Sequence, residues 1–268
     1  MKKVVFITGI SSGFGKQTSS YLAQKGYTVY GTVRAECEHD PLVNVLQLDV
    51  TDQSAVEKCI GLVLENEGRI DVLINNAGMH TGGAIEVTPN SHISAQMETN
   101  FMGAVHTIKA VLPAMRNKGS GTIMNISSIG GLMGLPFQGY YSACKFAIEG
   151  FSEALRMEVK QFKIKVIVIN PGDFHTNNTK NRKNVFTSEN NDSYKEQFSK
   201  SLSVIEHDEN NGWNPEVLAH KLYKILEKKR PANRYVIASM EQKLAVLLKR
   251  LLPGKWFARI LSSHYGLR

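Results

Sequence analysis

Cysteine is scarce in this sequence. Its 268 residues include three cysteines, Cys37, Cys59 and Cys144, which are scattered and lack the paired spacing of disulfide frameworks and zinc sites. Neither a disulfide-stabilised fold nor a metal site is therefore expected. Because unpaired cysteines suit a reducing compartment, we expect the protein in the cytoplasm.

Long apolar runs are also missing. No segment reaches the roughly 20 apolar residues that a membrane-spanning helix needs, which argues against integral membrane insertion. The apolar residues 4–7 follow two lysines but are too few for a signal peptide, and they run directly into Thr8-Gly9. We interpret them as a buried first strand.

Basic residues outnumber acidic residues, which could indicate a nucleic-acid partner, but the distribution of the charge argues against one. The net charge is +8, and residues 239–268 contribute six basic side chains against one acidic side chain, Glu241. The excess therefore belongs to the C-terminal segment, and we expect no nucleic-acid partner.

What the sequence does contain is an alternation of short apolar segments with longer segments of helical character. Hydrophobic residues make up 42% and charged residues 21%, as is ordinary for a globular protein with a continuous core. This alternation is typical of βαβ units that build a parallel sheet. We expect an α/β fold with one Rossmann-type, doubly wound parallel sheet of about seven strands flanked by helices.

The expected elements can be placed by residue number. Strands are predicted at residues 4–8, 28–33, 43–48, 72–75, 122–127, 165–170 and 235–238. Helices are predicted at residues 15–25, 54–66, 91–117, 140–161 and 215–229. One catalytic domain is expected over residues 1–238. Within it, residues 174–212 form a long polar stretch that we interpret as a substrate lid, since long loops in compact domains are often functional. The candidate apolar contacts of this lid are Phe186, Tyr194, Phe198 and Trp213.

The first predicted strand leads into a glycine-rich segment, Thr8-Gly-Ile-Ser-Ser-Gly-Phe-Gly15, that opens the first helix. Backbone N–H groups and the helix dipole can hold a pyrophosphate there. Gly9 would permit the tight turn, Gly13 a close approach of the phosphates, and Gly15 close packing of helix on strand. An ordinary strand-to-helix turn is the alternative. The cofactor contacts expected here are Gly9, Ser11, Ser12, Gly13, Phe14 and Gly15.

In folds that bind NAD, a carboxylate at the end of the second strand binds the free 2′-hydroxyl of the ribose. This sequence has Arg34 at that position instead. A guanidinium instead suits a 2′-phosphate, so the sequence favours NADP(H) over NAD. A solvated surface arginine is the alternative. Asp49 and Val50, after the third strand, are expected beside the adenine, although Asp49 or Asp52 could equally cap a helix.

Tyr141 and Lys145 are four residues apart in a predicted helix, so both side chains emerge on one face. A nearby ammonium stabilises a phenolate and thereby lowers the pKa of the phenol. Ser128 ends the fifth strand, at the sheet edge where ligands bind in open α/β folds, and could bond a substrate oxygen. Each residue alone is more often structural, but together they favour proton transfer.

These motifs occur in a recognisable order: the glycine-rich segment, Asn75-Asn-Ala-Gly78, Asn100, Ser127-Ser128, Tyr141-x-x-x-Lys145 and Pro171-Gly172. Over about residues 3–240 the chain resembles the short-chain dehydrogenase/reductase family. This resemblance implies Tyr141 as general acid/base, Ser128 as the group that orients the carbonyl, Lys145 on the nicotinamide ribose, and Asn100 as the holder of a relay water.

The resemblance also assigns further cofactor contacts: Asn76, Ala77 and Gly78 on the adenosine side, and Pro171, Gly172 and Thr176 on the nicotinamide side. One residue departs from the pattern, because many members carry serine where this chain has Cys144. A packing role is expected for this cysteine, and a reactive thiol is the alternative.

Three segments, 128–137, 145–150 and 171–176, are similar to the 17β-hydroxysteroid dehydrogenase type 1 and retinol dehydrogenase branch. That similarity implies an NADP(H)-dependent interconversion of a carbonyl and an alcohol on a small lipophilic substrate: a steroid, a retinoid or a long-chain keto lipid such as 3-ketosphinganine. The substrate contacts expected are Ser128, Tyr141, Phe174 and His175.

Other functions remain open at this point. An NADP-binding dehydratase or epimerase would commonly carry a larger C-terminal domain, and a non-catalytic NADP-sensing or scaffold protein would not need the four reacting residues. The family resemblance further implies a homodimer or homotetramer.

The C-terminal extension, residues 239–268, begins with a capping box at Ser239-Met-Glu-Gln242. Leucines follow at helical spacing until Pro253-Gly254 ends the helix, and residues 256–261 continue the apolar character. An apolar face beside basic residues is typical of helices that lie on a membrane surface. We expect the extension to make peripheral membrane contact or to form an apolar rim for substrate entry, while packing on its own domain or a neighbouring subunit is the alternative.

Overall fold

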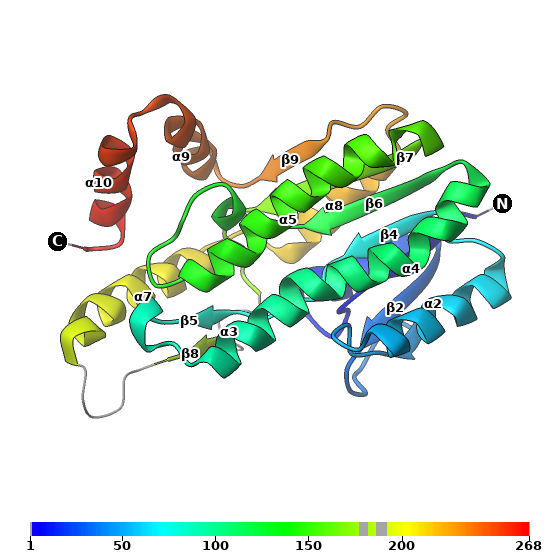
Figure 1. Cartoon of the computed structure of the whole chain (residues 1–268), viewed down its shortest axis with the longest axis horizontal. Coiled ribbons are helices and arrows are strands. Elements are labelled where there is room, and N and C mark those ends of the chain that lie inside the picture. Colours follow the sequence, from blue (N-terminus) through cyan, green and yellow to red (C-terminus); the bar gives the residue numbers. More distant parts are fainter. Residues whose placement is uncertain (1, 177–181, 186–191, 268) are drawn as a thin grey trace.

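The computed structural model describes residues 2–176, 182–185 and 192–267. Within them lies a seven-stranded parallel sheet with the order β3-β2-β1-β4-β6-β7-β9 (Figure 1). Its strands are β1 (Val4–Ile7), β2 (Thr28–Val33), β3 (Val43–Gln47), β4 (Val72–Asn75), β6 (Gly121–Ile126), β7 (Ile164–Pro171) and β9 (Arg234–Ile237). The order reverses between β1 and β4, which is where doubly wound sheets bind ligands. The expected fold class is confirmed.

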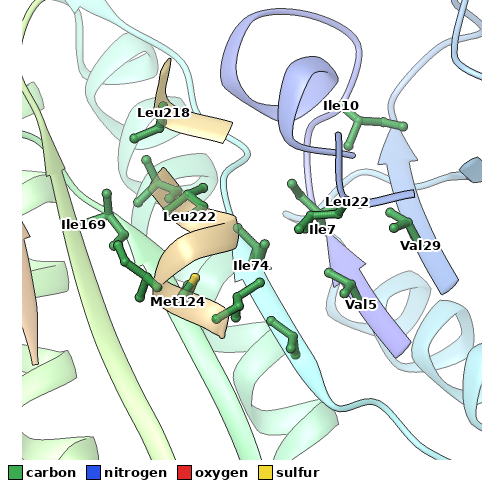
Figure 2. Close-up of a cluster of buried hydrophobic side chains, with 14 of the residues drawn as sticks. Val5, Ile7, Ile10, Leu22, Val29, Ile74, Met124, Ile169, Leu218 and Leu222 are labelled. Atoms are coloured by element: carbon green, nitrogen blue, oxygen red, sulfur yellow. The ribbon is translucent and has the colours of Figure 1, made fainter. Parts of the chain in front are cut away.

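Helices cover both faces of this sheet. The flanking helices are α1 (Gly13–Gln24), α2 (Gln53–Glu67), α4 (Gly103–Lys118), α5 (Gly139–Glu158) and α8 (Pro215–Leu226). Leu22 of α1 and Leu218 of α8 pack on one face, in the core cluster that Figure 2 shows. Val56 of α2 and Ile108 of α4 pack on the other face. Burial on both faces explains why β1 is apolar at every position and β4 is apolar up to its last residue, Asn75.

Two local signals decide where α2 begins and ends. Asp52 caps its N-terminus by accepting a hydrogen bond from the Ala55 N–H at 3.0 Å, and Gly68 ends it with φ +70°. Asp49 instead accepts from the backbone and hydroxyl of Thr51, at 3.0 and 2.8 Å. Of the two aspartates that the sequence offered as a cap, Asp52 holds the position and Asp49 lies beside the sheet edge.

The single helix expected over residues 91–117 is more complex. It consists of α3 (Asn90–Met97), a π-helical turn at Glu98–Met102, and α4. A π turn inserts one residue into the helical repeat and is often found at functional sites. Here it carries Asn100.

The stretch at residues 174–212 is also more ordered than a loop. It contains α7 (Lys195–Asn210), and β8 (Lys183–Asn184) pairs with β5 (Thr81–Gly82) beside the main sheet. The expectation of a lid without secondary structure was wrong, because Phe198, Leu202 and Ile205 give α7 a buried apolar face despite the polar composition. Phe186, which we named as a possible apolar contact of this lid, lies outside the described residues.

The C-terminal extension forms two helices. The capping box at Ser239 is present and opens α9 (Met240–Leu251), as the sequence predicted. Pro253 ends that helix, but α10 (Gly254–His264) begins directly after it, which we did not expect. Val246 and Phe257 pack on Met133 in a small apolar cluster, so part of the extension packs on its own domain. Among the described helices, none is long and apolar enough to cross a membrane.

Candidate active site

A large cavity of about 1380 Å³ runs along the carboxyl ends of the strands. In Figure 1 the arrowheads of β6 and β9 point toward the side where α7, α9 and α10 lie, and these three helices line the cavity. Residues from the ends of β2, β4, β6 and β7 complete it. The cavity is therefore located where the sequence analysis placed the reacting groups.

The glycine-rich segment connects β1 to α1 and lines one end of the cavity. Gly9 and Gly13 have φ of +72° and +53°, a conformation that side chains disfavour. Gly15 packs so closely on the turn of this segment that a Cβ there would collide with the Gly9 carbonyl oxygen. The side chain of Asn76 donates to the carbonyls of Thr8 and Gly9 at 2.9 and 2.8 Å and so holds the turn.

The N-terminus of α1 opens on the same cavity. Ser12 precedes the helix in an extended conformation, and within the described residues its side chain makes no capping hydrogen bond. Helix-initial N–H groups lack partners within their own helix, and the dipole favours an anion there. This arrangement can hold the phosphates of a dinucleotide.

The other residues expected on the adenosine side also line the cavity: Arg34, Asp49, Val50, Asn76, Ala77 and Gly78. Arg34 is exposed, and its backbone is fixed by the side chain of Gln47, which donates to the Arg34 carbonyl at 3.0 Å. Its guanidinium can therefore reach a ligand at the end of β2.

Tyr141 and Lys145 lie one helical turn apart on α5 and both line the cavity. The Lys145 ammonium nitrogen lies 5.7 Å from the centre of the Tyr141 ring and donates to the Ile126 carbonyl at 2.8 Å. Burial lowers the pKa of Lys145 to about 8. Lys145 therefore remains mostly charged at neutral pH.

The Tyr141 phenol does not follow the expected direction. Burial raises the pKa of Tyr141 to about 12, while its hydrogen bond with Ser128 and the charge of Arg182 act to lower it. We expected Lys145 to make the phenol more acidic, but the ammonium is held by the Ile126 carbonyl and burial dominates. In this state the phenol keeps its proton at neutral pH.

Ser128 and Asn100 approach the centre from two other elements. Ser128 follows β6, and its hydroxyl accepts from the Gly130 N–H at 3.0 Å. Asn100 is buried on the π turn, where its side chain accepts from the Met79 N–H at 2.7 Å and donates to the Met79 carbonyl at 2.8 Å. Asn100 therefore fixes the loop after β4 beside the cavity that it lines.

The segment after β7 contributes Pro171, Gly172, Phe174 and Thr176 to the cavity. Phe174 is buried and packs edge-on against the Phe14 ring at 4.9 Å. His175 is exposed and does not line the cavity, so the structure does not bring it to the predicted substrate site. Successive side chains of an extended segment alternate, and His175 points outward, where its Nδ1 lies 3.1 Å from the Asn210 carbonyl.

The aromatic residues expected in the lid have different environments. Trp213 lines the cavity and contacts Phe174 edge-on, with ring centres 6.0 Å apart. Phe198 is buried against Phe137 below the cavity wall, and the Tyr194 hydroxyl donates to Glu86 on the surface. Only Trp213 among these three is in a position to contact a ligand.

One group of lining residues was not identified from the sequence. Asp173, Asp208 and Glu209 place carboxylates on the cavity wall, and burial together with the charges of Asp208 and Glu209 raises the pKa of Asp173 to about 6. A further part of the lining is apolar and comes from the C-terminal extension, which the sequence offered as an apolar rim: Leu244, Ala245, Leu248, Phe257, Ile260 and Leu261. These residues are distant in sequence, and only the fold brings them together.

Cys144 is a packing residue. It is fully buried and its sulfur lies 3.1 Å from the Met97 sulfur. Burial raises the pKa of its thiol to about 11, so the reactive thiolate is disfavoured. The expectation of a packing role is consistent with these surroundings.

Residues 3–185 match the family model described as short chain dehydrogenase. The chain belongs to this family of oxidoreductases, whose members bind a nicotinamide cofactor. It is 45% identical over 266 residues to the 3-ketodihydrosphingosine reductase of Bacteroides thetaiotaomicron, with 99% of each chain covered. The sequence-based family assignment and the prediction of an enzyme are confirmed.

Two further relatives match over a shorter region. Retinol dehydrogenase 8 of Homo sapiens is 38% identical over 184 residues, which cover 63% of this chain and 58% of the relative. The 17-beta-hydroxysteroid dehydrogenase type 1 of Mus musculus is 36% identical over 189 residues, which cover 65% and 54%. The resemblance to this branch is confirmed.

Solved structures give the same fold. A short-chain dehydrogenase from Streptomyces avermitilis aligns with a TM-score of 0.82 and 31% identity, over 99% of this chain and 97% of that chain. ElxO, solved with NADP bound, aligns with a TM-score of 0.73 and 28% identity, over 89% and 97%.

Proposed function

We propose that this enzyme uses NADPH to reduce the carbonyl group of a long-chain lipid, with Tyr141 as the general acid. The observation that carries the proposal is the convergence of Tyr141, Ser128 and Lys145 in one cavity with the glycine-rich segment. Gly9, Gly13 and the open N-terminus of α1 fit the phosphates of a dinucleotide, which would supply the hydride when bound.

The protein's own groups then act on the carbonyl oxygen. Ser128 and Tyr141, which are hydrogen-bonded to each other, bind that oxygen, and Tyr141 donates its proton as negative charge develops there. A pKa of about 12 keeps Tyr141 protonated at neutral pH, which is the form that reduction requires. The Lys145 ammonium lines the same cavity and would hold the cofactor ribose. Asn100 fixes the adjoining loop and holds a relay water.

We propose 3-ketodihydrosphingosine as the substrate, on the strength of the match over 99% of both chains to the Bacteroides reductase. This molecule is a long-chain ketone with an amino group beside the carbonyl. The carboxylates of Asp173 and Glu209 lie near enough to affect the Tyr141 phenol, so they suit a substrate ammonium next to the reacting carbon. The apolar wall from α9 and α10 suits its alkyl chain.

A substrate comparison tests this proposal. We expect NADPH oxidation with 3-ketodihydrosphingosine, and a lower kcat/KM with the same ketone after N-acetylation, because acetylation removes the positive charge. A long-chain ketone without nitrogen separates the contribution of the alkyl chain from that of the ammonium. Turnover of a steroid or retinoid carbonyl with a higher kcat/KM would instead assign the enzyme to the activities named for its shorter matches.

Arg34 is proposed to select NADPH by pairing with the 2′-phosphate. Arg34→Asp should lower the ratio of kcat/KM for NADPH to that for NADH by about 10- to 100-fold, because a charged hydrogen bond is lost and a carboxylate replaces it. Lys16→Gln is the matched control, since Lys16 is a second basic residue near the start of α1. If Lys16→Gln changed the ratio and Arg34→Asp did not, Lys16 would be the residue that binds the phosphate.

The C-terminal extension is proposed to contact a membrane surface beside the cavity mouth. Leu244, Leu247, Leu251, Trp256 and Ile260 each expose about half or more of their surface, although Leu244 and Ile260 also line the cavity. The neighbouring basic side chains are also exposed: Lys243, Lys249, Arg250, Lys255 and Arg259. An apolar face with positive flanks fits anionic lipid and would admit a lipid substrate from the bilayer.

Vesicle co-sedimentation tests this contact. The full chain should sediment with anionic vesicles at low salt, and the double variant Leu251→Ser/Trp256→Ser should remain in the supernatant. Leu42→Ser/Leu62→Ser is the control, because these side chains are 60% and 44% exposed but lie elsewhere. Equal sedimentation of both double variants would show that residues 239–268 do not form the contact.

We further propose one catalytic domain over residues 1–238 in which residues 174–212 cover the substrate, with the extension completing the cavity. A homodimer or homotetramer is proposed to form through α5, whose Phe146 and Met157 are 45% and 68% exposed and would be buried by a second copy.

A further inference from the structure

A buried histidine lies against the reactive tyrosine. The His80 and Tyr141 rings are stacked, with centres 4.2 Å apart and planes inclined by 22°. His80 is 3% exposed and follows the Asn76-Ala77-Gly78 loop. Burial and the positive charges of Arg182 and Lys145 hold the pKa of His80 well below its usual range. The imidazole is therefore neutral and can accept a hydrogen bond.

Arg182 supplies that hydrogen bond at the edge of the His80 ring. Its Nε donates to His80 Nδ1 at 3.4 Å, and its guanidinium pairs with Glu209 of α7. The Arg182 side chain is only 1% exposed. The backbone next to Arg182 is also fixed on the backbone of His80, because the Lys183 N–H donates to the His80 carbonyl at 2.9 Å and β8 pairs with β5. A buried cation is thus held at a fixed position beside the imidazole ring that stacks on Tyr141.

We infer that Arg182 is a positioning residue for the proton transfer at Tyr141: it holds His80 against the phenol ring and carries a charge that Glu209 of α7 balances. This inference rests on the proposed role of Tyr141 as general acid. It assigns a function to three residues outside the group of Tyr141, Ser128, Lys145 and Asn100.

The charged groups around Tyr141 determine in which direction each of them shifts the pKa of its phenol. The groups that face or contact Tyr141 come from six elements or loops: Lys145, Ser128, His80, Arg182, Glu209 and Asp173. Arg182 lowers the pKa of Tyr141, whereas Glu209 and Asp173 raise it. A cation favours the phenolate and a carboxylate disfavours it. Removal of Arg182 and removal of Glu209 should therefore shift the ionisation of Tyr141 in opposite directions.

The experiment measures the ionisation of Tyr141 directly. The full chain is labelled with ¹³Cζ-tyrosine, and the Tyr141 signal is assigned as the one that Tyr141→Phe removes. We expect Glu209→Gln to lower the titration midpoint by about one pH unit and Arg182→Gln to raise it by a similar amount, for charges several ångströms away in a partly screened interior. The double variant Arg182→Gln/Glu209→Gln should titrate near the wild-type midpoint.

Two further variants separate charge from structure. Arg182→Lys keeps the cation and should keep the midpoint near the wild-type value. Glu196→Gln makes the same chemical change as Glu209→Gln at an exposed position of α7 and should leave the midpoint unchanged. If Arg182→Gln does not fold, the titration midpoints of Glu209→Gln and Glu196→Gln can still be compared. A lower midpoint in Glu209→Gln is the expected effect of removing the carboxylate.

The pH profile of alcohol oxidation supplies the second readout. Oxidation requires the phenolate, so the rising limb of kcat/KM should move to lower pH in Glu209→Gln and to higher pH in Arg182→Gln. Shifts in the same direction, or no shift in either readout, would overturn the inference. Opposite NMR shifts in a protein that turns over no alcohol or ketone would keep the inference about the Arg182 charge and contradict the proposed function.

Discussion

Tyr141→Phe should reduce kcat for ketone reduction by about 10²- to 10⁴-fold while leaving NADPH affinity nearly unchanged. The substitution removes the proton that we propose Tyr141 donates and its hydrogen bond with Ser128, but it keeps the ring that stacks on His80. Steady-state kinetics give kcat, and fluorescence titration gives the NADPH dissociation constant.

Tyr140→Phe is the matched control for this prediction. Tyr140 is the preceding residue on α5, and its hydroxyl donates to the Ile85 carbonyl at 3.1 Å, on the surface. This variant loses a phenol hydroxyl from the same helix and should retain wild-type turnover. Near wild-type kcat in Tyr141→Phe would show that the proton comes from another group.

Gly15→Ala should raise the dissociation constant of NADPH by about 10- to 100-fold, because overpacking a tight contact typically costs 1–3 kcal/mol. The added methyl group would collide with the Gly9 carbonyl oxygen and the Asn76 side chain. These atoms belong to the turn that we propose holds the phosphates, so the strain falls on the cofactor site. Isothermal titration with NADPH measures the effect.

Gly61→Ala is the control for this second prediction. Gly61 lies in the interior of α2, and a Cβ there has no atom within 4 Å. Alanine is a better helix former by up to about 1 kcal/mol, so this variant should bind NADPH normally and unfold at the same or a higher temperature. Equal NADPH affinity in Gly15→Ala and the wild type would contradict the proposed phosphate site.

The sequence was sufficient to predict the sheet and the turn of the glycine-rich segment, which lines one end of the cavity, because both depend on local patterns. The apolar run of β1 and the glycines that follow it are contiguous, so their spacing alone indicates a strand, a tight turn and a helix start. Tyr141 and Lys145 could be paired for the same reason, since a four-residue spacing brings two side chains to one helical face.

The substrate end of the cavity could not be predicted in the same way. Arg182 reaches His80 only because β8 pairs with β5, and no periodicity in the sequence indicates a two-residue strand. α7 was not predicted because its composition is polar. α10 was not predicted because the Pro253-Gly254 pair indicated only the end of α9. The direction of the Tyr141 pKa depends on how deeply the phenol is buried, which no spacing reveals.

The position of α9 and α10 has a consequence for how this enzyme could diversify. The glycine-rich segment, Ser128, Tyr141 and Lys145 all fall within residues 3–185, the part that matches the family model, whereas one wall of the cavity comes from residues 244–265. Gln242 of α9 hydrogen-bonds to Asp173 directly after β7, which joins that wall to the rest of the cavity. The proposed reacting groups and this apolar wall therefore lie in separate stretches of chain. Recombination near residue 238 would exchange the wall and leave the proposed reacting groups in place.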